Sequence, residues 1–380
     1  MFVFASRLAL GHQLSFSILS LHRSEMDPAY STAPRRVLLI TYPRTASNLL
    51  VKMLALEDQP NVVSNEMGGY FFWDAFMNER KAVSEGKPME QWNAKDTGEV
   101  RQAFQQNFNV FEDMSQSAIS NGKIFFAKEH TLWFADPGAL AQYLSTHDYQ
   151  PSSSRLSIQL PDPYSMAPMI FSSKNFTIFP DEYLETWSPT FLIRHPALAF
   201  PSYYRALQKL EKGGFAEEEI EAPMLELHST LLWTRLLYDW YHEREGNSHS
   251  HPHSHEGQYN DICFPLVLDA HDIIHSPEVI LRYCELLGMD PAAVKVAWQT
   301  QSTPGSGCPE SADKVMTETL DHSSCLLKQK TPSTVDIAVE RGNWEVEFGH
   351  GLAKQMEGWV RAAMPDYNYL WARRLKLHLN

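Results

Sequence analysis

A short segment of cationic, hydroxyl and amide residues carries the clearest chemical signal in the sequence. Residues 42–48 read Tyr-Pro-Arg-Thr-Ala-Ser-Asn; they follow an apolar, partly β-branched run at 37–41 (VLLIT) and precede an apolar pattern of helical spacing. A parallel strand that turns tightly into a helix gathers several backbone N–H groups, and the helix N-terminus adds about half a positive charge. We therefore expect an anion site within residues 37–56.

The side chains of this turn extend that expectation. Arg44 offers a planar fork of donors for bridging oxyanions, and Thr45, Ser47 and Asn48 add hydroxyl and amide groups. The segment lacks the GxxxxGK(S/T) pattern of nucleotide hydrolases and the GxGxxG of dinucleotide binders, so neither function is indicated. The alternative interpretation is an ordinary N-capped helix with Arg44 facing solvent.

A second candidate group follows a predicted strand at 123–127 (KIFFA). Lys128 and His130 are two residues apart, so on a continuing strand both side chains point to one face and could reach one ligand. A histidine with a pKa near neutrality suits a general base, and a lysine can stabilise developing negative charge. Glu129 is the competing base; it should face the opposite way on a strand, although a turn there would reverse the choice.

A third candidate stands at the end of another predicted strand, 190–193 (TFLI). Arg194 follows it directly. Ligands of open α/β sheets bind outside the carboxyl ends of the strands, which favours anion binding by Arg194 over an ordinary ion pair. Ser202 should lie in the first turns of the next helix, where its hydroxyl can donate to the same anion.

The spacing of apolar residues predicts the elements that position these groups. A further strand is expected at 264–268, helices at 137–145, 197–211, 224–243 and 277–287, and loops at 149–168, 245–258 and 300–334. Strands that alternate with helices predict an α/β fold with a central parallel sheet flanked by helices in three layers. We expect one domain over 35–380, preceded by a disordered or extension tail at 1–34.

Composition narrows the function. The formal net charge of −14 disfavours general binding of nucleic acid or of anionic membranes. The four cysteines show no zinc spacing, which favours reduced thiols in a cytoplasmic protein. The His-rich stretch 249–255 lacks a carboxylate or cysteine framework, so no metal is expected. The aromatic stretch 70–73 with Phe76 indicates core packing first and, second, the lining of an acceptor pocket.

Four segments together resemble a known family. TYPRTASNLL is similar to the 5′-phosphosulfate loop (TYPKSGTTW in cytosolic members) of sulfotransferases that depend on 3′-phosphoadenosine 5′-phosphosulfate (PAPS). FLIRHPALAFPSYYRAL resembles their 3′-phosphate motif, AKEHTLWF resembles the Lys-Thr-His-Leu-Pro segment, and ERGNW at 340–344 resembles the C-terminal Arg-Lys-Gly signature. The segments occur in the family's order, and the overall pattern is closest to poorly characterised fungal sulfotransferase-like proteins.

The resemblance implies a P-loop type fold and a role for each matched residue. His130 would be the general base, with Lys128 and Arg44 stabilising the transition state. The residues that would bind PAPS are Arg44, Thr45, Ala46, Ser47, Asn48, Arg194, Ser202, Arg341 and Gly342. PAPS is then the co-substrate and a small hydroxylated molecule the acceptor, without nucleic acid or membrane partners; a homodimer is left open.

The sequence departs from the family at two loop positions. Ala46 replaces a glycine, so the loop can wrap a phosphate less closely, and Leu49 replaces the tryptophan that stacks on adenine in cytosolic members. These changes keep open a nucleotide-binding protein of the same fold that has lost turnover. A P-loop phosphotransferase is a third reading, disfavoured by the missing Lys-Ser/Thr pair.

Overall fold

The part of the chain that can be described begins at Arg35. The computed structural model describes residues 35–377 apart from 152–154, 163, 166–167, 216–217, 249–262, 299–319, 321–322, 329–330 and 333. Residues Arg35–Asn380 form one compact unit. The tail expected at 1–34 and the His-rich stretch 249–255 lie outside the described residues.

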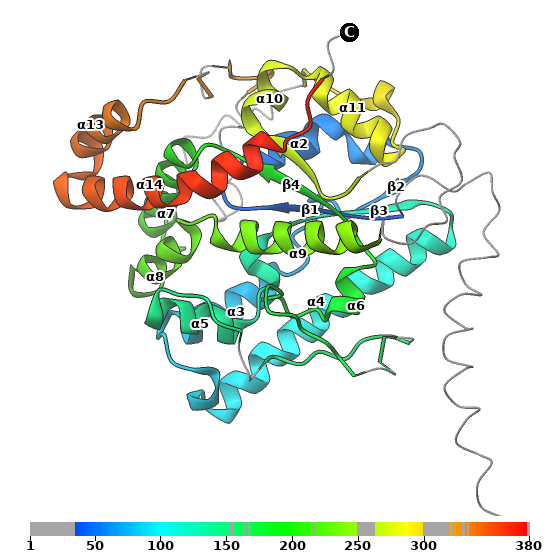
Figure 1. The fold of residues 1–380 in the computed structure, drawn as a ribbon, viewed down its shortest axis with the longest axis horizontal. Coiled ribbons are helices and arrows are strands. Elements are labelled where there is room, and N and C mark those ends of the chain that lie inside the picture. The colour runs from blue at the N-terminus through cyan, green and yellow to red at the C-terminus, as the bar shows by residue number, and fades with distance from the viewer. Residues whose placement is uncertain are drawn as a thin grey trace, which may run out of the picture. The chain divides into compact units, whose positions relative to one another are not determined.

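A parallel sheet forms the centre of this unit (Figure 1). Its strands are β1 (Arg36–Thr41), β2 (Val62–Val63), β3 (Ile124–His130), β4 (Ser188–Ile193) and β5 (Leu266–Asp269). They lie in the order β2-β3-β1-β4-β5, and every pair is parallel. The strands expected at 37–41, 123–127, 190–193 and 264–268 correspond to β1, β3, β4 and β5, which confirms the parallel α/β fold.

Helices cover both faces of the sheet. They are α2 (Ser47–Leu54), α3 (Trp73–Ser84), α4 (Ala94–Ser120), α5 (Pro137–Thr146), α6 (Asp181–Leu184), α7 (Pro196–Lys212), α8 (Glu218–His228), α9 (Leu232–Ser248), α10 (Ala270–His275), α11 (Glu278–Leu287), α13 (Ile337–Phe348) and α14 (His350–Ala372). Short 3₁₀ turns lie at Leu56–Asp58, Met89–Gln91, Thr131–Phe134 and Pro291–Ala293.

The alternation of side chains along β1 explains the layers. Val37 and Leu39 belong to a core shared with α2, α10 and α11, whereas Leu38 and Ile40 belong to the larger core shared with α3, α4 and α9. Successive side chains of a strand point to opposite faces, so a fully apolar strand needs helices on both sides. Figure 1 shows these helix layers above and below the sheet.

The structure differs from the expected helices and loops in three places. The helix expected at 224–243 is divided into α8 and α9 at 229–231, where the Thr230 hydroxyl accepts from the N–H of Leu232, the first residue of α9, in a local turn. Residues 245–248 continue α9 instead of opening a loop. Helices α3, α4, α6, α10, α13 and α14 and the short strand β2 were not predicted.

The predicted loops at 149–168 and 300–334 are described only in part. The described residues of 149–168 lie outside helices and strands, as expected. Most of 300–334 lies outside the described residues; within it, Leu320 is helical and Cys325 forms an isolated bridge with Ala297.

Candidate active site

Three neighbouring strands bring the candidate residues to one edge of the sheet. Thr41 at the end of β1 pairs in register with His130 at the end of β3, and Arg194 directly follows β4, the other neighbour of β1. The turn from residue 42 to 46 leads from β1 into α2. Because parallel strands end at a common edge, all the candidate groups on these strands converge there.

The turn has the backbone geometry of an anion loop. Arg44 and Ala46 both have φ +69°, the left-handed region that favours glycine. Ala46 caps α2 without a side-chain hydrogen bond, and no acidic residue lies in the first turn of the helix. The N–H groups and the dipole of α2 are therefore directed at the space beyond the turn. Thr45 is buried inside the turn, where its hydroxyl donates to the Tyr42 carbonyl over 3.1 Å.

Arg44, Arg194 and Ser202 form a cluster beside this turn. Arg44 Nε donates to Ser202 Oγ over 3.1 Å, and an Arg194 guanidinium N–H donates to the Arg44 carbonyl over 2.9 Å. Burial, reinforced by Arg44, lowers the pKa of Arg194 to about 10. Two guanidinium groups at one point repel each other, and an anion that bears more than one charge would relieve that repulsion.

His130 faces the same space from the other side. Its ring is buried, lies 5.1 Å from the ring of Tyr70 and 4.5 Å from that of Trp133 (centroid distances), and its Nδ1 lies 2.6 Å from Thr41 Oγ1. Thr41 also donates to the Glu129 carbonyl. Burial, with the nearby charge of Lys128, holds the pKa of His130 well below its usual range, so the ring is neutral at pH 7. A neutral imidazole can accept a proton.

Lys128 differs from the expectation that it reaches the ligand beside His130. It is fully buried and does not line the cavity; its Nζ donates to Asn48 Oδ1 over 2.6 Å and lies 3.6 Å from the centroid of the Tyr70 ring. Burial lowers its pKa to about 7. Lys128 thus acts on the cavity through Asn48 and Tyr70, which both line it.

Glu129 points away from the site, as its place on the strand predicts. Its Oε1 accepts from the backbone N–H of Phe71 over 2.5 Å, and burial raises its pKa to about 8. It does not line the cavity. Of His130 and Glu129, only His130 lines the cavity.

Arg341 and Gly342 are the sequence candidates that the structure does not bring to this site. They lie within α13, and Arg341 forms ion pairs with Glu345 (3.7 Å) and with Glu357 of α14 (3.0 Å). Neither residue lines the cavity. A regular helix holds the backbone N–H groups of this segment in its own hydrogen bonds, so they are not presented to a phosphate.

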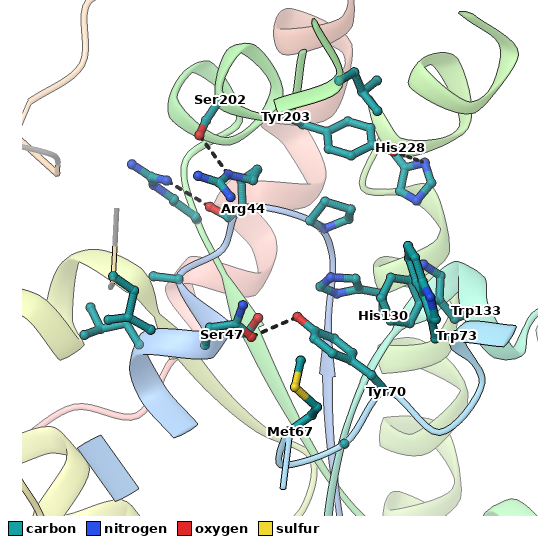
Figure 2. Close-up of a pocket in the computed structure, with 18 of the residues that line it drawn as sticks. Arg44, Ser47, Met67, Tyr70, Trp73, His130, Trp133, Ser202, Tyr203 and His228 are labelled. Carbon is teal, nitrogen blue, oxygen red and sulfur yellow. Dashed lines mark hydrogen bonds between the residues drawn. The ribbon is translucent and has the colours of Figure 1, made fainter. Parts of the chain in front are cut away.

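The candidate groups surround a cavity of about 400 Å³. Six residues of the turn and the cluster line it: Arg44, Ala46, Ser47, Asn48, Arg194 and Ser202. Figure 2 shows Arg44, Ser47 and Ser202 on one side of it. The other side is mostly aromatic and is lined by Tyr70, Trp73, Phe76, Trp133, Tyr203 and His228. Within the stretch 70–73, Phe71 and Phe72 are core residues, whereas Tyr70 and Trp73 face the cavity. The core-packing interpretation therefore holds for Phe71 and Phe72, whereas an acceptor-binding role for Tyr70 and Trp73 stays a prediction.

His228 is a cavity residue that sequence reasoning missed. Its Nδ1 lies 2.7 Å from the Met224 carbonyl, which fixes the proton on that nitrogen, and its ring contacts Tyr203. Burial lowers its pKa to about 4. The sequence offers no local signal for it, since it is one of 16 histidines and its helix is brought to the cavity only by tertiary packing.

The structure shows neither a metal-binding cluster nor a membrane-spanning helix among the described residues. Within the described ranges, no group of three or more His, Cys, Asp or Glu side chains could hold a metal ion. Among the helices of the described residues, none combines the length and the apolarity needed to cross a bilayer.

Comparison with known proteins places the chain in a family. No family model matches it. A protein named sulfotransferase ppzF from Metarhizium rileyi is 37% identical over 349 residues, which cover 92% of this chain and 98% of that protein. A second sulfotransferase ppzF, from Metarhizium majus, is 38% identical over 90% of this chain and 97% of its own length. The chain belongs to the sulfotransferase family. The turn, the guanidinium cluster and His130 are thus candidate active-site groups of a sulfotransferase.

Solved structures with sulfotransferase titles are more distant. The sulfotransferase domain of the Synechococcus PCC 7002 olefin synthase is 11% identical, with a TM-score of 0.31 over 84% of this chain and 96% of that one. The sulfotransferase domain of the curacin biosynthetic pathway is 14% identical, with a TM-score of 0.29 over 77% and 100%. At these TM-scores equivalent residues are not superposed, so no residue role is transferred from either structure.

Proposed function

We propose that this sulfotransferase moves a sulfuryl group from PAPS to a hydroxyl group of a small-molecule acceptor. One observation carries the proposal: the anion turn after β1, the cluster of Arg44, Arg194 and Ser202, and His130 surround one cavity. A donor with two separated anionic groups and an acceptor that must lose a proton fit this set of residues.

The donor fits the turn side of the cavity. The N–H groups of the turn and of the first turn of α2, with Ser47, Asn48 and Arg44, would bind the 5′-phosphosulfate. Arg194 and Ser202, joined by Arg44, would bind the 3′-phosphate. Leu49 lines the same side and would contact the adenine. The proposal assigns no part to Arg341 and Gly342, because they would have to leave α13 to reach the cavity.

Sulfuryl transfer then needs a base and charge stabilisation. The acceptor oxygen forms a bond to sulfur while the bond from sulfur to the 5′-phosphate oxygen breaks, and that oxygen takes the electron pair. His130 would accept the acceptor's proton at Nε2. Arg44 and the N–H groups of α2 would stabilise the charge that builds on the leaving oxygen, with Lys128 adding its charge from behind Asn48.

The test is an assay of transfer and of binding. Purified protein is incubated with radiolabelled PAPS and a panel of phenols and alcohols, and binding of the product nucleotide, PAP, is measured by calorimetry. Labelled product together with saturable PAP binding supports the proposal. Absence of both would reject it.

A non-catalytic nucleotide-binding protein is the second candidate function. Two features favour it: Ala46 is an alanine at a backbone position that favours glycine, and Lys128 is buried behind Tyr70, away from the cavity. It predicts PAP binding that His130→Ala leaves unchanged, and no labelled product with any acceptor. We also propose a cytoplasmic location, which the free thiols of Cys284 and Cys325 support.

A further inference from the structure

Tyr70 has a strained backbone beside the proposed active site. Its φ is +64°, which is unfavourable for a bulky aromatic residue. Strain of this kind persists only where the surroundings enforce it, and it clusters at functional sites. The strained backbone therefore makes the Tyr70 side chain a candidate for a functional role.

The neighbouring glycines show how the strain is enforced. Lys128 N–H donates to the Gly68 carbonyl over 2.9 Å, and Tyr70 N–H donates to the Lys128 carbonyl over 2.8 Å. A Cβ atom at Gly69 would lie 2.0 Å from the Lys128 carbonyl oxygen, so only glycine allows this approach. The segment is held against β3, and Tyr70 leaves it in the direction of the cavity.

The Tyr70 side chain occupies the place expected for Lys128. Its ring lies between the Lys128 ammonium, 3.6 Å from the centroid, and the cavity that it lines. Its hydroxyl donates to Asn48 Oδ1 over 3.0 Å, at the first turn of α2. The ring also lies 5.1 Å from that of His130 (centroid distance). Figure 2 shows Tyr70 between the turn side, with Ser47, and His130.

The hydroxyl is suited to be a hydrogen-bond donor. Burial raises the pKa of Tyr70 above its usual range, so the phenol keeps its proton at physiological pH. Asn48 Oδ1 already accepts from Lys128 Nζ over 2.6 Å, which is the shorter of its two hydrogen bonds. The amide oxygen therefore stays satisfied when the phenol turns to a ligand.

We propose that Tyr70 is a catalytic residue, whose hydroxyl donates a hydrogen bond to the phosphosulfate oxygen that gains charge as its bond to sulfur breaks. The inference rests on the proposed function and changes one part of it. The direct donor at this position is the phenol of Tyr70, while the Lys128 ammonium lies behind the ring and holds Asn48.

The test compares Tyr70→Phe with the wild-type protein. Phenylalanine keeps the ring over Lys128 and the same backbone strain, and removes only the hydroxyl. Turnover is followed both as transfer to an added acceptor and as release of labelled inorganic sulfate from PAPS, in which water accepts the sulfuryl group. We expect kcat to fall on the order of 100-fold, as for loss of one donor to a developing anion, while the KM for PAPS, whose bridging oxygen carries little charge before transfer, and the Tm change little.

Tyr241→Phe is the matched control. It removes another buried tyrosine hydroxyl, which donates to the Leu184 carbonyl over 3.2 Å and does not line the cavity. Its kcat should equal that of the wild type. Unchanged turnover in Tyr70→Phe would overturn the inference and leave the proposed function standing. A loss of PAPS affinity in the ground state with an unchanged kcat would make Tyr70 a donor-binding residue alone and would also overturn it.

Failure of the proposed function has a different result. A wild-type protein that binds PAP but neither transfers nor releases sulfate from PAPS would reject the function and this inference with it. The wild-type measurement thus distinguishes the two failures before any variant is compared.

Discussion

Arg44 Nε donates a hydrogen bond of 3.1 Å to Ser202 Oγ, across 158 positions of the sequence. This contact joins the anion turn after β1 to the helix that follows β4. The turn after β1 and the segment after β4, which suggested separate 5′ and 3′ anion sites in the sequence, therefore line one side of the same cavity.

Loss of the Arg194 side chain should weaken binding of the 3′-phosphate and leave binding of the 5′-phosphate nearly unchanged. In Arg194→Met we expect the affinity for PAP to fall by about 10- to 100-fold, as for lost hydrogen bonds to a charged group. The affinity for 5′-AMP, which has no 3′-phosphate, should change by less than about threefold. Calorimetry with both nucleotides measures this. Arg282→Met, at an exposed position of α11, is the control. An equal loss for both nucleotides would contradict the assignment of Arg194 to the 3′ side.

His130→Ala should remove turnover and keep donor binding. A general base contributes about 10²- to 10⁴-fold, so kcat should fall in that range while the Kd for PAP stays within about threefold of the wild-type value. Loss of PAP affinity in parallel with kcat would instead show a structural role for the ring.

The pH dependence of the same reaction is a separate prediction. Burial keeps the pKa of His130 well below its usual range in the free protein. A depressed pKa means that the base stays unprotonated to lower pH, so the acid limb of kcat/KM should lie below the ordinary histidine pKa of about 6.5. A limb above that value would point to another base.

Ala46→Gly should relieve strain at the anion turn. Ala46 has φ +69°, where an L-residue costs about 1–2 kcal/mol and glycine does not. Glycine also makes the unfolded chain more flexible, which offsets about 0.4–1 kcal/mol of this gain. We expect a net increase in the free energy of unfolding of up to about 1.5 kcal/mol, measured by urea denaturation, with PAP affinity retained or improved. Ala46→Val should lower both.

His228 should make stability depend on pH between about 4 and 6.5. Burial lowers its pKa from 6.5 to about 4 in the folded protein, so within this window the unfolded chain binds more protons than the folded one. The free energy of unfolding therefore rises with pH across the window, and the stabilisation is fully present above pH 6.5. In His228→Asn, which retains a donor for the Met224 carbonyl, urea denaturation should show a smaller slope. An unchanged slope would exclude His228 as its source.

The local sequence pattern was sufficient to predict four of the five strands of the sheet, and the turn that follows β1. Four strands, and the turn that contains Arg44 and Ala46, follow from short apolar runs and from what comes directly after them. Helices α3 and α4 were missed. The segment 224–243 was predicted as one helix, because a local turn such as that at Thr230 can interrupt an apolar pattern without changing its spacing.

The sequence by itself determined which residues reach the carboxyl edge of the sheet: strand period and strand ends place His130, Arg194 and the turn there. Only the tertiary structure decided what lies between them. The alternation of side chains along a strand puts Lys128 on the same face as His130. It cannot show that Tyr70, whose segment is held against β3 by Gly69, covers Lys128. It also cannot show that Arg341 is held in α13 by Glu345 and Glu357. Side-chain direction is a local property of the backbone, whereas access to a ligand depends on which distant segments pack in front.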